Sequence, residues 1–91
     1  MRLPATLTVA EARGAWQELS IESAALEGSL LHIDASALTD FDSAALALLL
    51  QARRQAQAKA LSFEVSGAPD KLVQLAQLYG VAELLGLHAK G

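Results

Sequence analysis

Residues 41–57 read FDSAALALLLQARRQAQ, in which seven consecutive apolar residues follow a serine and precede a polar run. On a helical wheel of about 100° per residue, one face is wholly apolar and forms the expected core stripe, made of Ala45, Leu49, Ala52 and Ala56. The other side would normally be polar, yet most of its members are apolar. They are Ser43, Leu46, Ala47, Leu50 and Arg54. The stretch therefore predicts a helix over residues 43–58 with an exposed apolar patch beside its first serine, and such patches mark partner sites.

Composition restricts the class of protein. The chain has 91 residues, enough for one domain that buries about 60 to 65% of its unfolded surface. A net charge of −3 with scattered basic residues argues against a nucleic-acid partner, which requires a basic face. The absence of cysteine excludes disulfides and thiolate metal ligands. With no signal peptide and no apolar run longer than seven residues, we expect a cytoplasmic protein without direct membrane insertion.

Capping residues and apolar stripes mark the other helices. A capping box over residues 8–11 predicts a helix that runs to about residue 20 and docks through Val9, Ala12, Trp16 and Leu19. A proline and a glycine bound a further helix over residues 69–80, and residues 81–87 form a short closing turn or helix. The core stripe of the helix over 69–80 consists of Leu72, Leu75, Ala76 and Tyr79. Val73 and Leu78 fall off this stripe and would extend the exposed apolar area.

Three short stretches are candidates for strands. Residues 30–34 form a β-compatible apolar run, and residues 61–65 alternate with period two, which predicts a strand with one wet face. Residues 2–6 add a brief first strand. The resulting order of strand and helix, repeated along the chain, is typical of right-handed crossovers on a mostly parallel sheet. The sequence therefore predicts an α/β fold.

Acidic residues lie at and after the end of a predicted strand, which is where ligand-binding and active sites of α/β proteins are usually found. Asp34 ends one predicted strand, and Asp42 lies in the loop that follows it. No glycine-rich phosphate loop accompanies them, His32 and His88 lack ligand spacing, and Ser43 has no identifiable base. We therefore expect the two aspartates to shape the loop, with either Asp42 or Ser43 capping the helix, and expect no metal, no cofactor and no enzyme. A small enzyme that uses the acidic loop is the least favoured class.

Two segments together resemble a known family. The run Leu-His-Ile-Asp at residues 31–34, a six-residue loop and residues 41–50 resemble the central signature of STAS domains, named for sulfate transporters and anti-sigma factor antagonists. Residues 71–81, which include Leu-Ala-Gln-Leu-Tyr-Gly, resemble the last long helix of the MlaB branch. The resemblance spans about residues 5–87 and implies a single STAS domain over residues 1–91. Its fold would be a small, mixed and mostly parallel β-sheet of about four strands packed with about four helices.

MlaB-like proteins are cytoplasmic accessory subunits of ABC transporters that move phospholipids. The resemblance therefore implies a non-enzymatic subunit that binds the ATPase of an MlaFEDB-type transporter, regulates or stabilises it, and supports outer-membrane lipid asymmetry. Such a subunit is peripheral to the inner membrane through the transporter complex. The residues expected to bind the ATPase are Ser43, Leu46, Ala47, Leu50 and Arg54.

An anti-sigma factor antagonist is the alternative. Ser43 matches the hydroxyl position that a kinase-like anti-sigma factor phosphorylates in those antagonists, and Asp42 matches the acidic residue before it. The sequence departs from the family at Ala45, where many relatives have glycine. It also departs at residues 5–8, which read Ala-Thr-Leu-Thr in place of Gly-Glu-Leu-Asp, and the N-terminus looks shortened by a strand. The missing acid weighs against the kinase-switch interpretation.

Overall fold

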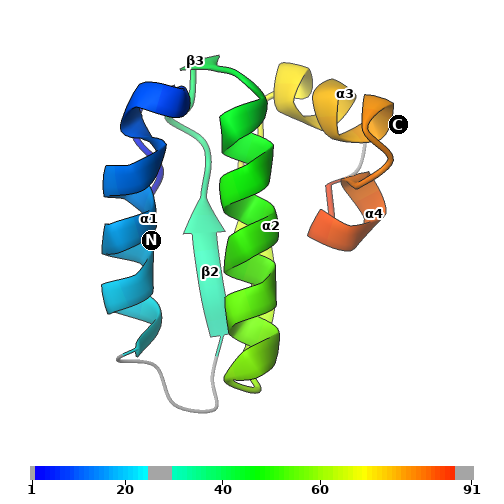
Figure 1. Ribbon diagram of the computed structural model, residues 1–91. Helices are drawn as coiled ribbons and strands as arrows, with labels where there is room; N and C mark the ends of the chain where they lie inside the picture. The colour runs from blue at the N-terminus through cyan, green and yellow to red at the C-terminus, as the bar shows by residue number, and fades with distance from the viewer. Residues whose placement is uncertain (1, 25–29, 88–91) are drawn as a thin grey trace.

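The computed structural model describes residues 2–24 and 30–87. The elements in chain order are β1 (Thr6–Leu7), α1 (Val9–Ala24), β2 (Leu30–Asp34), β3 (Asp40–Phe41), α2 (Ser43–Ala58), β4 (Ser62–Ser66), α3 (Asp70–Leu78) and α4 (Ala82–Leu85). Helices α1 and α2 lie side by side over one face of the sheet formed by β2 and β4 (Figure 1). Helices α3 and α4 pack on the side of α2 that faces away from α1. The predicted α/β class is confirmed.

The strand pairs of the described ranges are all parallel. Strand β2 pairs with β4 along its whole length, and β1 pairs with β3. Arg2 forms a parallel bridge with Asp34, and the Leu3 amide donates a hydrogen bond of 2.8 Å to the Asp34 carbonyl oxygen. The sheet predicted with about four strands therefore appears as two two-stranded pairs, and the expected first strand is split between the bridge at Arg2 and β1.

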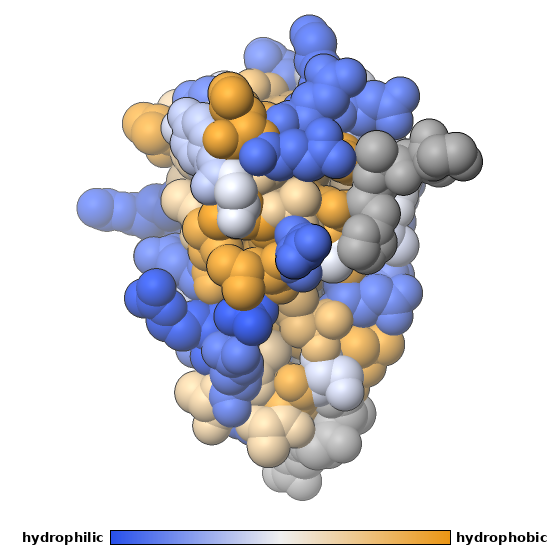
Figure 2. All heavy atoms as spheres, turned by 90° about the vertical axis from the view of Figure 1, so that its right-hand side faces the viewer, coloured by the Kyte–Doolittle hydropathy of each residue, from blue (hydrophilic) through white to orange (hydrophobic). Residues whose placement is uncertain are grey.

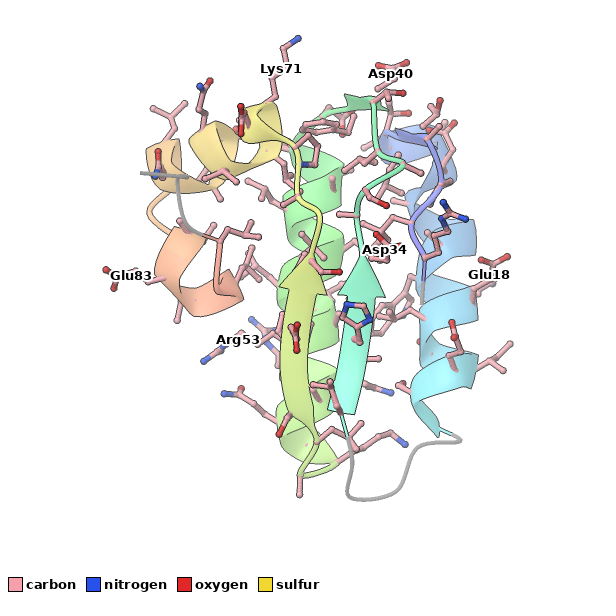
Figure 3. The ribbon with its side chains drawn as sticks, turned by 180° about the vertical axis from the view of Figure 1, so that it is seen from behind. Glu18, Asp34, Asp40, Arg53, Lys71 and Glu83 are labelled. Atoms are coloured by element: carbon pink, nitrogen blue, oxygen red, sulfur yellow. The ribbon has the colours of Figure 1, made fainter. Side chains whose placement is uncertain are left out.

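The two faces of the β2–β4 sheet have different environments. Leu31 and Ile33 of β2 are buried beneath the helices, whereas His32 and Glu64 are exposed on the other face. Figure 3 shows this second face from the front, and no helix of the described chain covers it. The wet face predicted from the alternation of residues 61–65 is confirmed, because alternate side chains of a strand point to opposite faces.

Helix α1 begins at its capping box. The Glu11 carboxylate accepts hydrogen bonds from the Thr8 amide at 2.8 Å and from the Thr8 hydroxyl at 2.6 Å. The Thr8 hydroxyl accepts a bond of 3.3 Å from the Ala10 amide, whereas the usual box would use the amide of Glu11. These hydrogen bonds from Thr8 hold the pKa of Glu11 below its ordinary value. The helix start therefore agrees with the prediction.

Helix α1 ends later than expected. It continues beyond residue 20 to Ala24, although the sequence suggests a connector over residues 21–28, and residues 25–29 lie outside the described residues. Ser23 is fully buried in this extra turn, where its hydroxyl donates to the Ser20 carbonyl oxygen at 3.1 Å. The Gln55 side-chain amide of α2 donates to the same hydroxyl at 3.2 Å. This contact with α2 stabilises the last turn of α1. It joins residues far apart in the sequence, so the sequence of the segment alone does not predict it.

Candidate partner-binding surface at the start of α2

The Asp42 carboxylate joins the starts of the two long helices. Its Oδ1 accepts a hydrogen bond of 2.8 Å from the Ala44 amide, which caps α2. Its Oδ2 accepts a longer bond of 3.4 Å from the Val9 amide at the first residue of α1. Asp42, and not Ser43, is thus the cap of α2, and Ser43 occupies the first helical position.

Five of the six exposed residues of α2 form a narrow row, which we call the α2 strip, and Gln57 is exposed beside this row. The members of the strip are Ser43, Ala47, Gln51, Arg54 and Ala58. Their spacing of three or four residues places them on one side of the helix. The Ser43 hydroxyl makes no hydrogen bond to any described residue, so it is available to a partner or to a modifying enzyme. Three of the five predicted partner-binding residues, Ser43, Ala47 and Arg54, lie on this strip.

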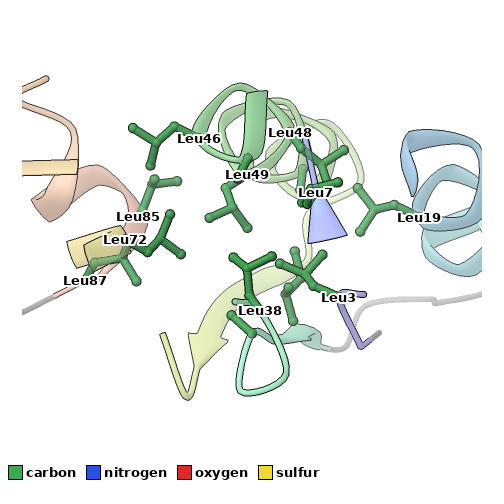
Figure 4. Packing of buried hydrophobic residues seen from close by; sticks show 14 of the residues in the cluster. Leu3, Leu7, Leu19, Leu38, Leu46, Leu48, Leu49, Leu72, Leu85 and Leu87 are labelled. Atoms are coloured by element: carbon green, nitrogen blue, oxygen red, sulfur yellow. The ribbon is translucent and has the colours of Figure 1, made fainter. Parts of the chain in front are cut away.

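Leu46 does not lie on the surface, and the prediction of an exposed apolar patch is wrong at this residue. Its side chain is 2% exposed and belongs to the hydrophobic core cluster. Figure 4 shows it on the side of α2 where Leu72 of α3 and Leu85 of α4 also lie. Leu50 is half-buried and packs against the same cluster. The physical reason is that α3 and α4 cover this side of α2, which a wheel drawn for one isolated helix cannot show.

A groove runs along the α2 strip between α2 and α1. We call it the α1–α2 groove. Its first part has a volume of about 520 Å³, and α2 contributes Ser43, Ala44, Ala47, Leu48 and Gln51 to its wall. The wall from α1 consists of Val9, Ala12, Arg13 and Trp16. A second part of about 350 Å³ shares Trp16 and Gln51 with the first and reaches Arg54. The Ser43 surface is therefore one end of an elongated groove.

The α1 side of this groove was not predicted from the sequence. Val9 is 77% exposed, although its place on the apolar stripe of α1 predicted that it would dock. Trp16 is half-buried, packs against the core and also lines the groove. The signal present in the sequence was that Val9 is an apolar residue at the first position of its helix.

A second exposed apolar area lies on the face formed by α3 and α4 (Figure 2). Leu78 is 79% exposed and Leu84 is 49% exposed, which agrees with the position of Leu78 off its core stripe. Tyr79 is 57% exposed, so its predicted place in the core is wrong. It follows the last residue of α3 and caps that helix, where no further turn holds its side chain against the core. Val73 is buried, contrary to the prediction that it would extend the exposed area.

Asp34 at the end of β2 and Asp42 before α2 each accept hydrogen bonds from backbone amides. An Asp34 carboxylate oxygen accepts a hydrogen bond of 2.9 Å from the Ser36 amide, and the bonds from Ser36 hold the pKa of Asp34 below its ordinary value. His32 lies on the open face of the sheet, with its Nε2 at 2.6 Å from the Ser66 hydroxyl oxygen. Within residues 2–24 and 30–87, no group of three His, Cys, Asp or Glu side chains could hold a metal ion. Asp34 thus stabilises the turn after β2, whereas Asp42 caps α2.

The fold and this surface define a class of small α/β binding domains in which a capped helix start presents a hydroxyl group. The chain matches the family model described as "Mlab, STAS domain" over residues 1–86. It therefore belongs to the STAS family, and it is MlaB-like. Comparison with curated proteins gives no match. The predicted STAS fold and the MlaB-like resemblance are confirmed.

Family membership sets the general role of the chain. STAS domains are generally non-enzymatic binding domains, and this one is a regulatory or accessory domain. In the part of the chain that the structure describes, each helix is too short or too polar to cross a membrane.

Proposed function

We propose that this chain is the accessory subunit that binds the ATPase of an MlaFEDB-type ABC transporter for phospholipids. Its membership in the MlaB-like STAS family supports this role. The observation that carries the proposal is the exposed start of α2, where Ser43 and Ala47 present a free hydroxyl and a small apolar surface beside a groove. No catalytic chemistry is required of the chain in this role.

Packing makes the surface suitable for regulation. Helix α2 is packed against α1, β4, α3 and α4, and Asp42 caps its first turn. Such a preformed surface loses little conformational entropy when it binds a partner. A bound subunit shifts the ATPase toward one state only through a difference in affinity for its states, and a tenfold difference corresponds to about 1.4 kcal/mol. Regulation or stabilisation of the ATPase would follow from that difference.

The proposed location follows from the proposed partner. A subunit held by the ATPase lies in the cytoplasm, next to the inner membrane, and needs no membrane segment of its own. The chain would then contribute to the lipid asymmetry of the outer membrane without contacting lipid itself.

A second candidate is an anti-sigma factor antagonist whose Ser43 is phosphorylated by a kinase-like anti-sigma factor. The exposed Ser43 hydroxyl, which has no hydrogen bond to a described residue, favours this candidate. Phosphorylation would add about −1.5 to −2 charges next to the Asp42 carboxylate and change any docking on the α2 strip. The residues at positions 5–8, which lack the acidic residues of the antagonists, weigh against it.

Affinity capture from the native cells distinguishes the two candidates. The variant Ala47→Glu places a charge on the exposed strip, and Gln77→Glu on exposed α3 is the matched control. We use Ala47 in preference to Leu50 because a charge at half-buried Leu50 would also disturb the core. Recovery of an ABC ATPase and permease with wild type and Gln77→Glu, but not with Ala47→Glu, is the expected result. Recovery of a sigma-regulating kinase together with phosphorylated Ser43 would replace the proposal with the second candidate.

A further inference from the structure

The charged side chains that line the α1–α2 groove are both basic. Arg13 of α1 and Arg54 of α2 line it, and its lining includes no aspartate or glutamate. The whole chain has the opposite tendency, with ten acidic and seven basic residues. Neither guanidinium forms an ion pair with another residue of the described chain. The groove therefore offers an occupant two guanidinium groups that have no ion-pair partner in the described chain, while the Asp42 carboxylate lies at its Ser43 end, where it caps α2.

The shape of the groove suits a helix. From Ser43 to Arg54 the strip spans eleven helical steps, or about 16 Å, which equals roughly three turns of a partner helix. The lining near Ser43 includes three alanines, Ala12, Ala44 and Ala47, beside larger side chains such as Val9 and Leu48. Small side chains allow a third helix to approach the α1–α2 pair at the usual distance of about 8 to 10 Å between axes.

We infer that the occupant of the α1–α2 groove is an acidic amphipathic helix of the partner ATPase. Its apolar side would pack on the alanines and Trp16, and its carboxylates would meet Arg13 and Arg54. The inference rests on the proposed function in one respect, since that function names the ATPase as the protein that supplies the helix. Arginine suits this contact because its planar guanidinium binds a carboxylate through two hydrogen bonds.

A second copy of this chain is a poorer occupant. In a two-fold symmetric dimer that buries the groove, the same surface of each copy faces the other. Arg13 and Arg54 would then lie close to the same arginines of the second copy, where like charges repel. An acidic partner helix removes this repulsion and pairs both arginines.

Charge reversal tests the groove with the purified ATPase subunit of the transporter. The double variant Arg13→Glu/Arg54→Glu reverses both groove charges. Arg53→Glu/Lys71→Glu changes the net charge equally but lies elsewhere, because Arg53 projects from α2 on the side away from α1 and Lys71 lies on α3 (Figure 3). We expect the first variant to weaken binding by roughly tenfold or more at low salt, with a smaller effect at high salt, and the control to change it by less than about twofold.

The same titration separates failure of the inference from failure of the proposed function. If the ATPase binds wild type and the groove variant with equal affinity, the acidic occupant is wrong while the proposed function stands. If the ATPase binds neither wild type nor variant, the proposed function fails, and the inference that rests on it fails as well. Circular dichroism confirms that each variant is folded, and Arg13→Gln/Arg54→Gln replaces the charge reversal if it is not.

Cross-linking identifies the occupant itself. The chain has no cysteine, so Ala47→Cys carries a single photo-crosslinker on the α2 strip and Glu64→Cys carries one on the open sheet face as a control. We expect the label at position 47, and not that at 64, to join a helical ATPase segment with acidic residues on one side. Cross-links to a second copy of this chain, to a segment without acidic residues, or only from position 64 would overturn the inference.

Discussion

The variant Leu46→Ala tests whether the Leu46 side chain belongs to the core or to the partner-binding surface. The Leu46 side chain is 2% exposed in the cluster that includes α3 and α4 residues. Truncating a buried leucine to alanine lowers the free energy of unfolding by about 2 to 5 kcal/mol. Proteins of this length have roughly 5 to 14 kcal/mol in total, so the loss is a large part of the stability. At about 4 to 8 °C per kcal/mol, the melting temperature should fall by at least about 8 °C.

Ala47→Glu is the matched comparison for this experiment, because the neighbouring residue is exposed. We expect it to change the free energy of unfolding by less than about 0.5 kcal/mol while it weakens ATPase binding. Urea unfolding followed by circular dichroism gives both free energies, and binding is measured well below the melting temperature of each variant. The reasoning is refuted if Leu46→Ala loses less than about 1 kcal/mol and abolishes binding, since Leu46 would then be part of the surface.

Three further predictions concern local structure. Asp42→Ala should lower the free energy of unfolding in urea by about 1 kcal/mol through loss of the α2 cap, whereas Asp40→Ala, which removes an exposed side chain that caps no helix, should have little effect; equal losses would contradict the assignment of the cap. Glu11 has a pKa held below its ordinary 4.5 by hydrogen bonds from Thr8, so its contribution is present above that value and is lost as the pH falls through the lowered pKa. Urea unfolding at a series of pH values should therefore show a smaller acid loss in Glu11→Gln, and identical profiles would count against the capping box. Gly67→Ala should destabilise the fold by at least about 1 kcal/mol in thermal or urea unfolding, because Gly67 has φ 68° and an added Cβ would lie 2.8 Å from a side-chain carbon of the loop after β2; an unchanged midpoint would show that this loop moves freely.

The starts of the long helices could be predicted because capping is local. The box that begins α1 acts between Thr8 and Glu11, and Asp42 acts on an amide two residues away. Strand β4 could be predicted for a similar reason, since the alternation of its side chains shows which face is wet. The sequence left open whether Asp42 or Ser43 caps α2, and the hydrogen bond to the Ala44 amide decides for Asp42.

The candidate site was predicted only in part. Ser43, Ala47 and Arg54 lie on the exposed strip, whereas Leu46 is buried, and their role in partner binding stays a prediction. Arg13 lies thirty positions before Ser43, so no pattern within one helix connects the two residues. They line one groove because α1 and α2 pack together over the sheet.

The sequence by itself determined the α/β class, the starts of α1 and α2, and the exposed hydroxyl at the start of α2. These features depend on capping and periodicity, which act over a few residues along the chain. Only the tertiary structure decided which apolar side chains of α2 remain exposed and which residues of α1 face them. The reason is that the exposure of a side chain depends on which elements pack over it, and α1, α3 and α4 come from parts of the chain far from α2 in sequence.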